Sequence, residues 1–132
     1  MRTTPWLTTA GLEFVTERHL ATLSTTRANG TPHCVPVGFT FDAEAGLVRI
    51  ITFDGSQKVR NVERAGYAAV TQLDGARWLT IEGPARISRE PADVREGEQR
   101  YAARYRVPKV NPRRVVIIIT IARTLGTTDF RS

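Results

Sequence analysis

The segment Gly55–Arg64, GSQKVRNVER, gathers residue types that suit an anion site. It follows a run of β-forming residues, Leu47–Phe53, and then has the pattern of a short helix. Where a strand passes through a Gly/Ser turn into a helix, the first backbone N–H groups point outward and can bind a phosphate or carboxylate. Lys58 adds a charge-assisted hydrogen-bond donor. The segment predicts an anion-binding turn; the alternatives are a helix cap for Ser56 and a solvated surface position for Lys58.

The other chemically versatile side chains form no catalytic set in the sequence. His19 and His33 have no cluster of Cys, His or carboxylate residues around them, so no metal site is expected. Cys34 lies in a strand-like segment and is interpreted as a small apolar residue. Glu82, in an otherwise apolar strand, is expected to pair with an arginine. We therefore assign no catalytic residue; if the chain is an enzyme, a bound anionic cofactor supplies the chemistry.

Length and composition are typical of one soluble globular domain. The chain has 132 residues, which we assign to a single domain, 1–132, and it is 41% hydrophobic and 24% charged. No apolar run approaches the roughly 20 residues needed to span a bilayer, and no leader pattern is visible at the N-terminus. The single cysteine excludes an internal disulfide. We expect a cytoplasmic protein without a membrane partner.

The formal net charge of +6 favours an anionic partner. Nucleic acid, a membrane surface and an anionic small molecule are the three classes that such a charge suits. Arginine far outnumbers lysine, and its planar fork suits fixed contacts to phosphate and carboxylate. The sequence shows no platform of aromatic and basic residues for single strands and no helix-turn-helix pattern. An anionic small molecule is therefore favoured, and no nucleic-acid partner is expected.

Alternating and β-branched segments predict a mainly β chain with a few short helices. Helices are expected over 9–15 with Thr9 as the N-cap, over 56–64 and over 91–106. The predicted strands are 20–26, 32–41, 47–53, 67–73, 78–88 and 114–122. Asn29-Gly30 and Asp74-Gly75 are hairpin turn signals. Because parallel strands need longer crossovers, these short connections predict a small antiparallel barrel.

The tetrapeptide Val35-Pro36-Val37-Gly38 is unusual for the interior of a sheet. Proline cannot donate to the strand ladder and belongs at an edge or bulge, while glycine permits close approach of another group. A flat ring lying against exposed strand backbone would explain both residues. An edge strand protected against aggregation explains them equally well.

Two further pairs of residues carry expectations. Tyr101 and Tyr105 are spaced i, i+4 on the last helix and are expected to pack against the barrel. Arg113 and Arg114 are adjacent at a strand start, so only one can face a given side. One of them could bind a ligand, with surface solubility as the alternative.

Several motifs, in order along the chain, resemble the split β-barrel flavin and deazaflavin proteins related to pyridoxamine 5′-phosphate oxidase. The motifs that carry this resemblance are Thr25–His33, Val35–Asp42, Ser56–Asn61 and Trp78–Gly83. Within the family the chain looks most similar to the branch that uses coenzyme F420, and there to F420-dependent biliverdin reductases. The motifs for this narrower resemblance are Glu17–Ala21, Val37–Asp42, Asp74–Leu79, Arg100–Ala102 and Asn111–Ile117. The full set of basic residues that pyridoxamine-phosphate oxidases use for their two phosphates is not found here.

The resemblance implies an antiparallel split β-barrel of the FMN-binding type, assembled as a homodimer with cofactor sites between the subunits. It implies coenzyme F420 as cofactor, with FMN as the alternative, and hydride transfer to an anionic small molecule such as biliverdin. A flavin- or haem-handling protein and a non-catalytic F420 carrier remain the rival functions. The implied cofactor residues are Val35, Pro36, Val37 and Gly38 along the ring, Gly55, Ser56, Gln57, Lys58 and Asn61 by the phosphate and polar tail, and Arg77 and Trp78 across the interface.

Overall fold

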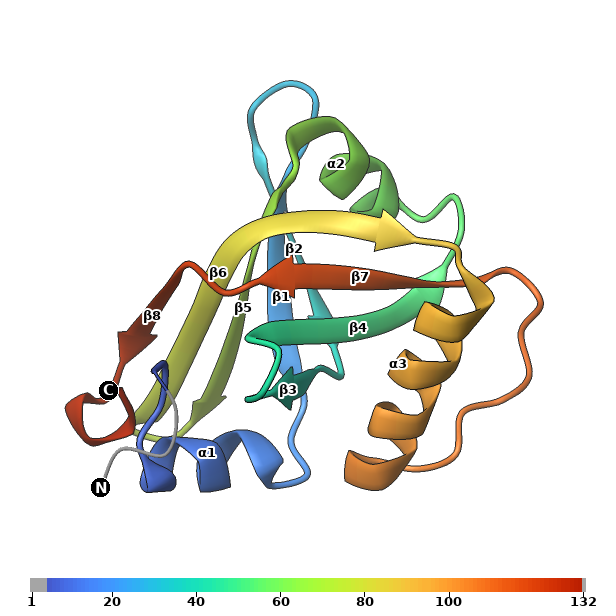
Figure 1. Ribbon diagram of the computed structural model, residues 1–132. Coiled ribbons are helices and arrows are strands. Elements are labelled where there is room, and N and C mark those ends of the chain that lie inside the picture. The colour runs from blue at the N-terminus through green and yellow to red at the C-terminus, as the bar shows by residue number, and fades with distance from the viewer. Residues whose placement is uncertain (1–4, 132) are drawn as a thin grey trace.

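The strands form one antiparallel sheet that curls around a single core (Figure 1). The computed structural model describes residues 5–131. In this range the strands are β1 (Ala21–Thr26), β2 (Pro32–Val37), β3 (Thr40–Asp42), β4 (Leu47–Phe53), β5 (Tyr67–Asp74), β6 (Arg77–Ser88), β7 (Arg114–Thr120) and β8 (Arg123–Gly126). The helices are α1 (Thr9–Thr16), α2 (Gln57–Ala65), α3 (Pro91–Arg104) and the 3₁₀ turn η1 (Thr128–Phe130).

The strand order leaves the barrel open along one line. The strands follow the order β2-β1-β5-β6-β7-β4-β3, with β8 added to β6, and every pairing is antiparallel. The end strands β2 and β3 are consecutive in the chain but are not paired with each other. The predicted split β-barrel of mainly β class is therefore confirmed, with the split lying where β2 passes into β3.

Two differences from the predicted strands follow from long-range packing. The expected strand 32–41 is interrupted at Gly38 and Phe39, which separate β2 from β3. The strand β8 was not predicted, and the expected last strand, 114–122, ends at Thr120. The molecule therefore has eight strands over the described residues where the sequence predicted six.

The strand β6 belongs to both halves of the sheet. Its first part pairs with β5 up to Pro84, and its last four residues, Ala85–Ser88, pair with β7. A Cβ atom added to Gly83 would lie 1.9 Å from the carbonyl oxygen of Thr120. Because only glycine fits so close to another backbone, β6 can bend from one half into the other at this point, as Figure 1 shows.

Three helices cover the sheet at different places. The helix α2 packs on β1 and β6, α3 packs on β4, β7 and β3, and α1 contacts η1 and β3. At the contact with α3, a Cβ atom on Gly97 would lie 3.0 Å from Ile51, so the glycine allows the helix to approach the sheet closely. Both faces of β7 are buried, which accounts for its unbroken apolar run Val115–Ile119.

In the described part of the chain, no helix is long and apolar enough to cross a membrane.

Local capping determines where the helices begin and end. Thr8, not Thr9 as predicted, caps α1, because its hydroxyl accepts a hydrogen bond from the backbone N–H of Gly11 at 3.1 Å. Ser56 caps α2 through the backbone N–H of Val59, as expected for serine at this position. The helix α3 ends at Arg104, two residues before the predicted end.

Asp42 ties three elements together through buried charge. Its carboxylate accepts hydrogen bonds from Arg49 at 2.8 Å and from the backbone N–H of Ala45 at 3.1 Å, and it lies 3.1 Å from Arg100 of α3. Burial by itself disfavours the charged form. The hydrogen bonds and the two arginines outweigh that effect, so the pKa of Asp42 is lowered.

We expect the substitution Asp42→Asn to lower the free energy of unfolding by about 3 kcal/mol at pH 7. The reason is that it leaves Arg49, which is mostly buried, without its charged partner. Since the pKa of Asp42 is lower in the folded protein than in the unfolded chain, its contribution is complete above the unfolded pKa. That contribution disappears as the pH falls through the folded pKa, so the two proteins should converge in strong acid. Urea unfolding at neutral and acid pH measures this, with Glu44→Gln as the matched control, because Glu44 is exposed. Equal stability of the two variants at pH 7 would contradict the assignment.

Candidate functional site

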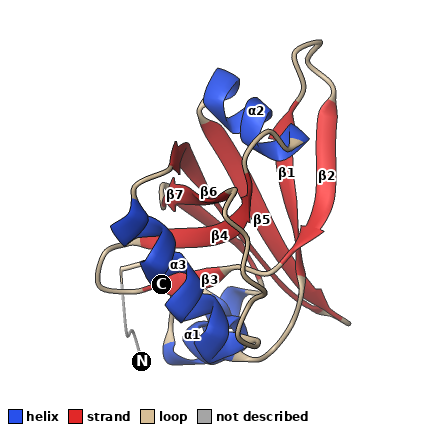
Figure 2. Ribbon diagram, turned by 90° about the vertical axis from the view of Figure 1, so that its right-hand side faces the viewer, coloured by secondary structure: helices blue, strands red, loops and turns tan. Residues whose placement is uncertain are grey.

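A cavity of about 400 Å³ lies beside the open line of the barrel. Its walls come from the end of β2, the end of β4, the start of α2 and the connecting segment 105–113 between α3 and β7, which Figure 2 shows running in front of the sheet. The lining residues are Pro36, Val37, Gly38, Ile51, Thr52, Phe53, Lys58, Tyr101, Arg106, Pro108, Lys109, Asn111 and Arg114.

The β2 wall presents a free strand edge to this cavity. Within the sheet β2 pairs with β1 alone, so its other edge carries backbone groups that no strand occupies. Pro36 and Gly38 therefore lie at an edge, as the sequence predicted. Such an edge can accept a flat ring, and the proline also protects it against pairing with another strand.

Gly38 is required by the packing of two tyrosines at the C-terminal end of α3. A Cβ atom at this position would lie 3.0 Å from a ring carbon of Tyr101 and 3.1 Å from one of Tyr105. The two rings lie with their centres 4.9 Å apart, so they form one aromatic surface against the end of β2. The expectation that the tyrosines pack against the barrel is confirmed.

Four cations line the cavity, and among the described lining residues there is no carboxylate. Arg114 donates to Glu98 at 2.9 Å, whereas Arg106 and Lys109 project from the connecting segment. The ammonium group of Lys58 lies 5.7 Å from the centre of the Phe53 ring, and burial lowers the pKa of this lysine. Burial disfavours the charged ammonium group of Lys58, and an anion entering the cavity would offset this effect because it would stabilise the charge.

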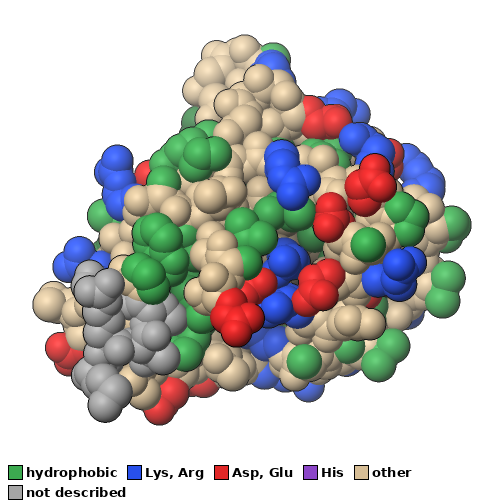
Figure 3. Space-filling model, in the orientation of Figure 1, with side chains coloured by type: hydrophobic (Ala, Val, Ile, Leu, Met, Phe, Trp, Pro, Cys, Tyr) green, Lys and Arg blue, Asp and Glu red, His purple; other side chains and the backbone are tan. Residues whose placement is uncertain are grey.

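This concentration of positive charge is local. Figure 3 shows acidic and basic side chains interspersed over the side of the molecule that carries α3. The net charge of +6 is therefore not concentrated in one basic patch on that face. The arrangement favours a small anion bound in a cavity over an extended polyanion bound on the surface.

Of the residues of the predicted anion-binding turn around α2, some line the cavity and others are buried in the protein. Lys58 lines the cavity, while Ser56 caps the helix. Asn61 is fully buried and donates to Thr25 of β1 at 3.0 Å, and Gln57 donates to Asn61 at 2.8 Å. These amides hold α2 against β1 and so fix the position of Lys58.

Gly55 and the arginine pair also have distinct positions. Gly55 adopts a φ of 85°, which the turn after β4 requires. The guanidinium of Arg113 donates to the carbonyl of Asp54 at 2.6 Å and supports that turn. Arg114 points to the cavity instead, which agrees with the expectation that the adjacent arginines face opposite sides.

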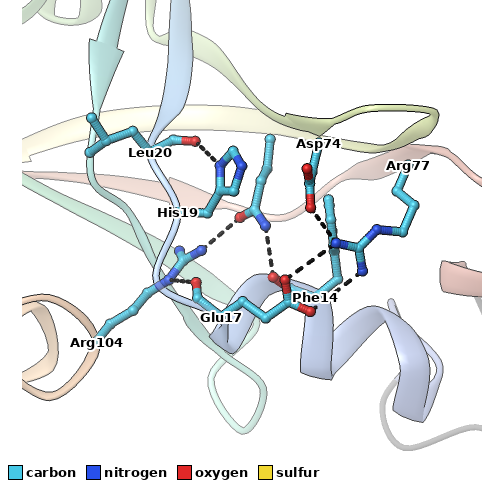
Figure 4. Close-up of polar contacts among 8 residues, drawn as sticks. Phe14, Glu17, His19, Leu20, Asp74, Arg77 and Arg104 are labelled. Carbon is cyan, nitrogen blue, oxygen red and sulfur yellow. Dashed lines mark hydrogen bonds and ion pairs between the residues drawn. The ribbon is translucent and has the colours of Figure 1, made fainter.

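Besides Gly55, Ser56, Gln57 and Asn61, three more of the predicted cofactor residues do not line this cavity. Val35 packs on the core, and Arg77 and Trp78 lie at the β5–β6 hairpin beside α1. Arg77 forms ion pairs with Asp74 and Glu17 and lies over the ring of Phe14 (Figure 4). Trp78 is 40% exposed. Their expected role across a subunit interface stays a prediction.

Sequence reasoning missed the contribution of the connecting segment to the cavity. Arg106, Pro108, Lys109 and Asn111 all line it. The available signal was the density of cations in RVPKVNPRR, where two prolines also prevent a helix. That pattern predicted only that the helix ends there. The sequence does not show that the segment then passes beside β2.

Two of the other polar candidates, Glu82 and His19, have structural partners. Glu82 accepts a hydrogen bond from the hydroxyl of Tyr67 at 3.0 Å and lies 3.8 Å from Arg123, which confirms its predicted pairing with an arginine. His19 contacts the carbonyl of Leu20 through Nδ1 at 2.7 Å. Over residues 5–131, no group of three or more His, Cys, Asp or Glu is placed to hold a metal ion.

Comparison with known proteins places the chain in a family. The family model described as pyridoxamine 5′-phosphate oxidase matches residues 7–127. A protein of Mycobacterium tuberculosis (strain CDC 1551 / Oshkosh) named F420H(2)-dependent biliverdin reductase is 51% identical over 129 residues, which cover 98% of this chain and 94% of the relative.

Solved structures show the same fold at lower sequence identity. A conserved hypothetical protein from Mycobacterium tuberculosis superposes with a TM-score of 0.75 at 25% identity, over 87% of this chain and 80% of the other. A structure named F420 reductase superposes with a TM-score of 0.68 at 22% identity, over 86% of this chain and 94% of that one. The second likeness supports the fold alone.

The contact between Gly38 and Tyr101 can be tested by stability. We expect Gly38→Ala to lower the free energy of unfolding by about 1–2 kcal/mol, because the new methyl group forces the tyrosine rings aside. In a Tyr101→Ala background the same substitution should cost less, because one of the two rings that crowd the methyl group is then absent. Chemical unfolding of the two single variants and the double variant measures the coupling. Additive effects would show that the ring does not restrict this position.

Proposed function

Because the chain belongs to the pyridoxamine 5′-phosphate oxidase family, we propose that it is a coenzyme F420-dependent oxidoreductase that reduces biliverdin to bilirubin. The observation that carries the proposal is the cavity that joins a free β2 edge to four cations. The relative that is 51% identical over 129 residues is named for the same cofactor and substrate.

The cavity fits the chemistry of this cofactor. Coenzyme F420 combines a flat deazaflavin ring with a phosphate and a glutamate tail, so it needs an apolar edge beside cationic groups. The edge is formed by Pro36, Val37 and Gly38, and we assign Lys58, at the start of α2, to the phosphate. The reduced ring supplies a hydride when the cofactor is bound.

The work left to the protein is binding, orientation and exclusion of water. The β2 edge orients a ring, and Phe53 and Tyr101 offer apolar surfaces on which the ring can pack. The excess of cations attracts an anionic substrate, an effect that salt weakens. The lack of an assigned acid–base pair is compatible with this chemistry, since the cofactor carries the reactive atom.

Two copies of the chain complete the proposed site. Leu73 and Trp78, on the β5–β6 hairpin, are 61% and 40% exposed. Burial of such side chains against a second copy is favourable, and tryptophan is common at interfaces. We therefore propose a homodimer in which Arg77 and Trp78 reach the partner's cofactor, and a cytoplasmic location, which the free thiol of Cys34 suits.

The fold also suits an FMN- or haem-handling protein, so the first experiment compares ligands. We expect purified protein to bind F420 at micromolar concentration or tighter and FMN more weakly, because the two cofactors differ in their anionic tails. Fluorescence titration of both cofactors measures this. Preferred binding of FMN would overturn the cofactor assignment while leaving the fold intact.

The reaction itself requires a separate measurement. With chemically reduced F420 under anaerobic conditions, we expect loss of biliverdin absorbance and formation of bilirubin at equal amounts. Reduced FMN and NADPH serve as controls for the electron donor. A protein that binds F420 but leaves biliverdin unchanged would be a carrier or a reductase of another substrate.

The role of Lys58 predicts a dependence on pH. We expect Lys58→Gln to weaken F420 binding by about tenfold or more, since a charged hydrogen bond is lost. Because burial lowers the pKa of Lys58, binding by the wild-type protein should weaken as the pH rises, beginning below the range of an ordinary lysine. Lys58→Arg should bind with little dependence on pH in that range. Fluorescence titration across the alkaline range measures both effects.

The matched control for Lys58 is Arg95→Gln, which removes one charge from an exposed position that does not line the cavity. If Arg95→Gln weakens F420 binding as much as Lys58→Gln does, the effect comes from general charge and not from contact.

A further inference from the structure

A second cavity, of about 430 Å³, adjoins the first on the far side of the tyrosine pair. Its lining residues are Arg18, His19, Leu20, Tyr101, Tyr105 and Arg106. Tyr101 and Arg106 line both cavities, so these two side chains form the wall between them. A molecule too long for one cavity can therefore extend past this wall into the other.

The chain around Arg18 is fixed from both sides by the end of α3. Arg104 donates through Nε to the carbonyl of Glu17 at 2.9 Å, and the hydroxyl of Tyr105 donates to the carbonyl of His19 at 2.8 Å. Figure 4 shows Arg104 reaching Glu17 beside His19. Burial raises the pKa of the Tyr105 hydroxyl, so it stays protonated and remains a donor. Arg18 thus projects from a segment whose backbone is held in place.

The charges of this second cavity have no acidic partner in the described chain. The carboxylate of Glu17, next to Arg18 in sequence, pairs with Arg77 at 3.4 Å. Neither Arg18 nor Arg106 makes a side-chain ion pair or hydrogen bond with another described residue. Two guanidinium groups with free donors therefore border a cavity that aromatic rings also line, an arrangement that suits a carboxylate attached to an apolar, conjugated body.

We propose that this second cavity is the substrate's carboxylate subsite, in which Arg18 and Arg106 bind a propionate while Tyr101 and Tyr105 pack against the conjugated part. The inference rests on the proposed function and deepens it, because it says how the substrate is held. The β2 edge lies on the cofactor side of the shared wall, and Arg18 lies on the other side. A carboxylate anchored at Arg18 would thus hold the conjugated chain of the substrate across the wall.

The glutamate tail of the cofactor carries the same carboxylate chemistry, so the test separates the two sources. The variants are Arg18→Gln and Arg18→Lys, with Arg95→Gln as the matched control, because Arg95 is exposed on α3 and lines neither cavity. The ligands are biliverdin, its dimethyl ester, and F420 with short and long glutamate tails. Quenching of protein fluorescence measures binding of each ligand without turnover.

We expect Arg18→Gln to weaken biliverdin binding about tenfold, in keeping with the loss of a charged hydrogen bond. Binding of the dimethyl ester and binding of F420 should not change. Arg18→Lys should recover part of the loss, and Arg95→Gln should bind biliverdin like the wild-type protein.

Three outcomes would overturn the subsite. They are equal weakening for the diacid and the ester, an equal effect of Arg95→Gln, and a loss confined to F420 with long tails. A wild-type protein that binds biliverdin with this pattern but does not reduce it would refute the proposed reaction and leave the subsite standing. Failure of the wild-type protein to bind biliverdin at all would refute both.

Discussion

The position of α3 depends on the hydrogen bonds of one mostly buried guanidinium. Arg104 donates to the carbonyl oxygens of Glu17 and Phe39 and to the side chain of Gln72 on β5. Gln72 in turn donates to the carbonyl of Phe14 in α1 at 2.7 Å. Burial lowers the pKa of Arg104, yet an arginine with three oxygen partners remains charged. This network joins α3 to α1, to β5 and to the break between β2 and β3, so the walls of both cavities depend on it.

The guanidinium group of Arg104 explains how the barrel can stay open while its structure is maintained. The carbonyl of Phe39 lies in the split, where a closed sheet would have offered it a strand partner. Arg104 supplies that partner from α3, and the hydroxyl of Tyr105 adds a second contact at 3.3 Å. Side chains of a helix thus satisfy backbone groups that the sheet leaves unpaired.

Much of the fold could be predicted because its signals are local. The Asn29-Gly30 turn forms the β1–β2 hairpin, and alternation along β1 places its apolar residues in the core. The break at Gly38 could not be predicted, because it depends on Tyr101, which is far away in the sequence. The short strand β8 was missed for a similar reason, since its four residues become a strand only by pairing with β6.

In the candidate site, too, the residues with local signals could be predicted and those with distant partners could not. Lys58 and the cap at Ser56 could be predicted from their place at a helix start. The role of Asn61 could not, because its partner Thr25 is brought to it by the fold. The cations of the connecting segment were visible as composition, but their position opposite β2 depends on how α3 is docked.

The bend of β6 at Gly83 has a consequence for how this fold can change over evolution. Side chains alternate along a strand, so one residue inserted before Gly83 would turn every later side chain of that strand to the opposite face. It would also move a residue with a side chain to the place where Thr120 leaves no room. The length of β6 is thus constrained, whereas the connecting segment 105–113 is neither helix nor strand and can tolerate insertions and deletions. Homologues can therefore acquire new ligand preferences by remodelling that segment while the barrel stays unaltered.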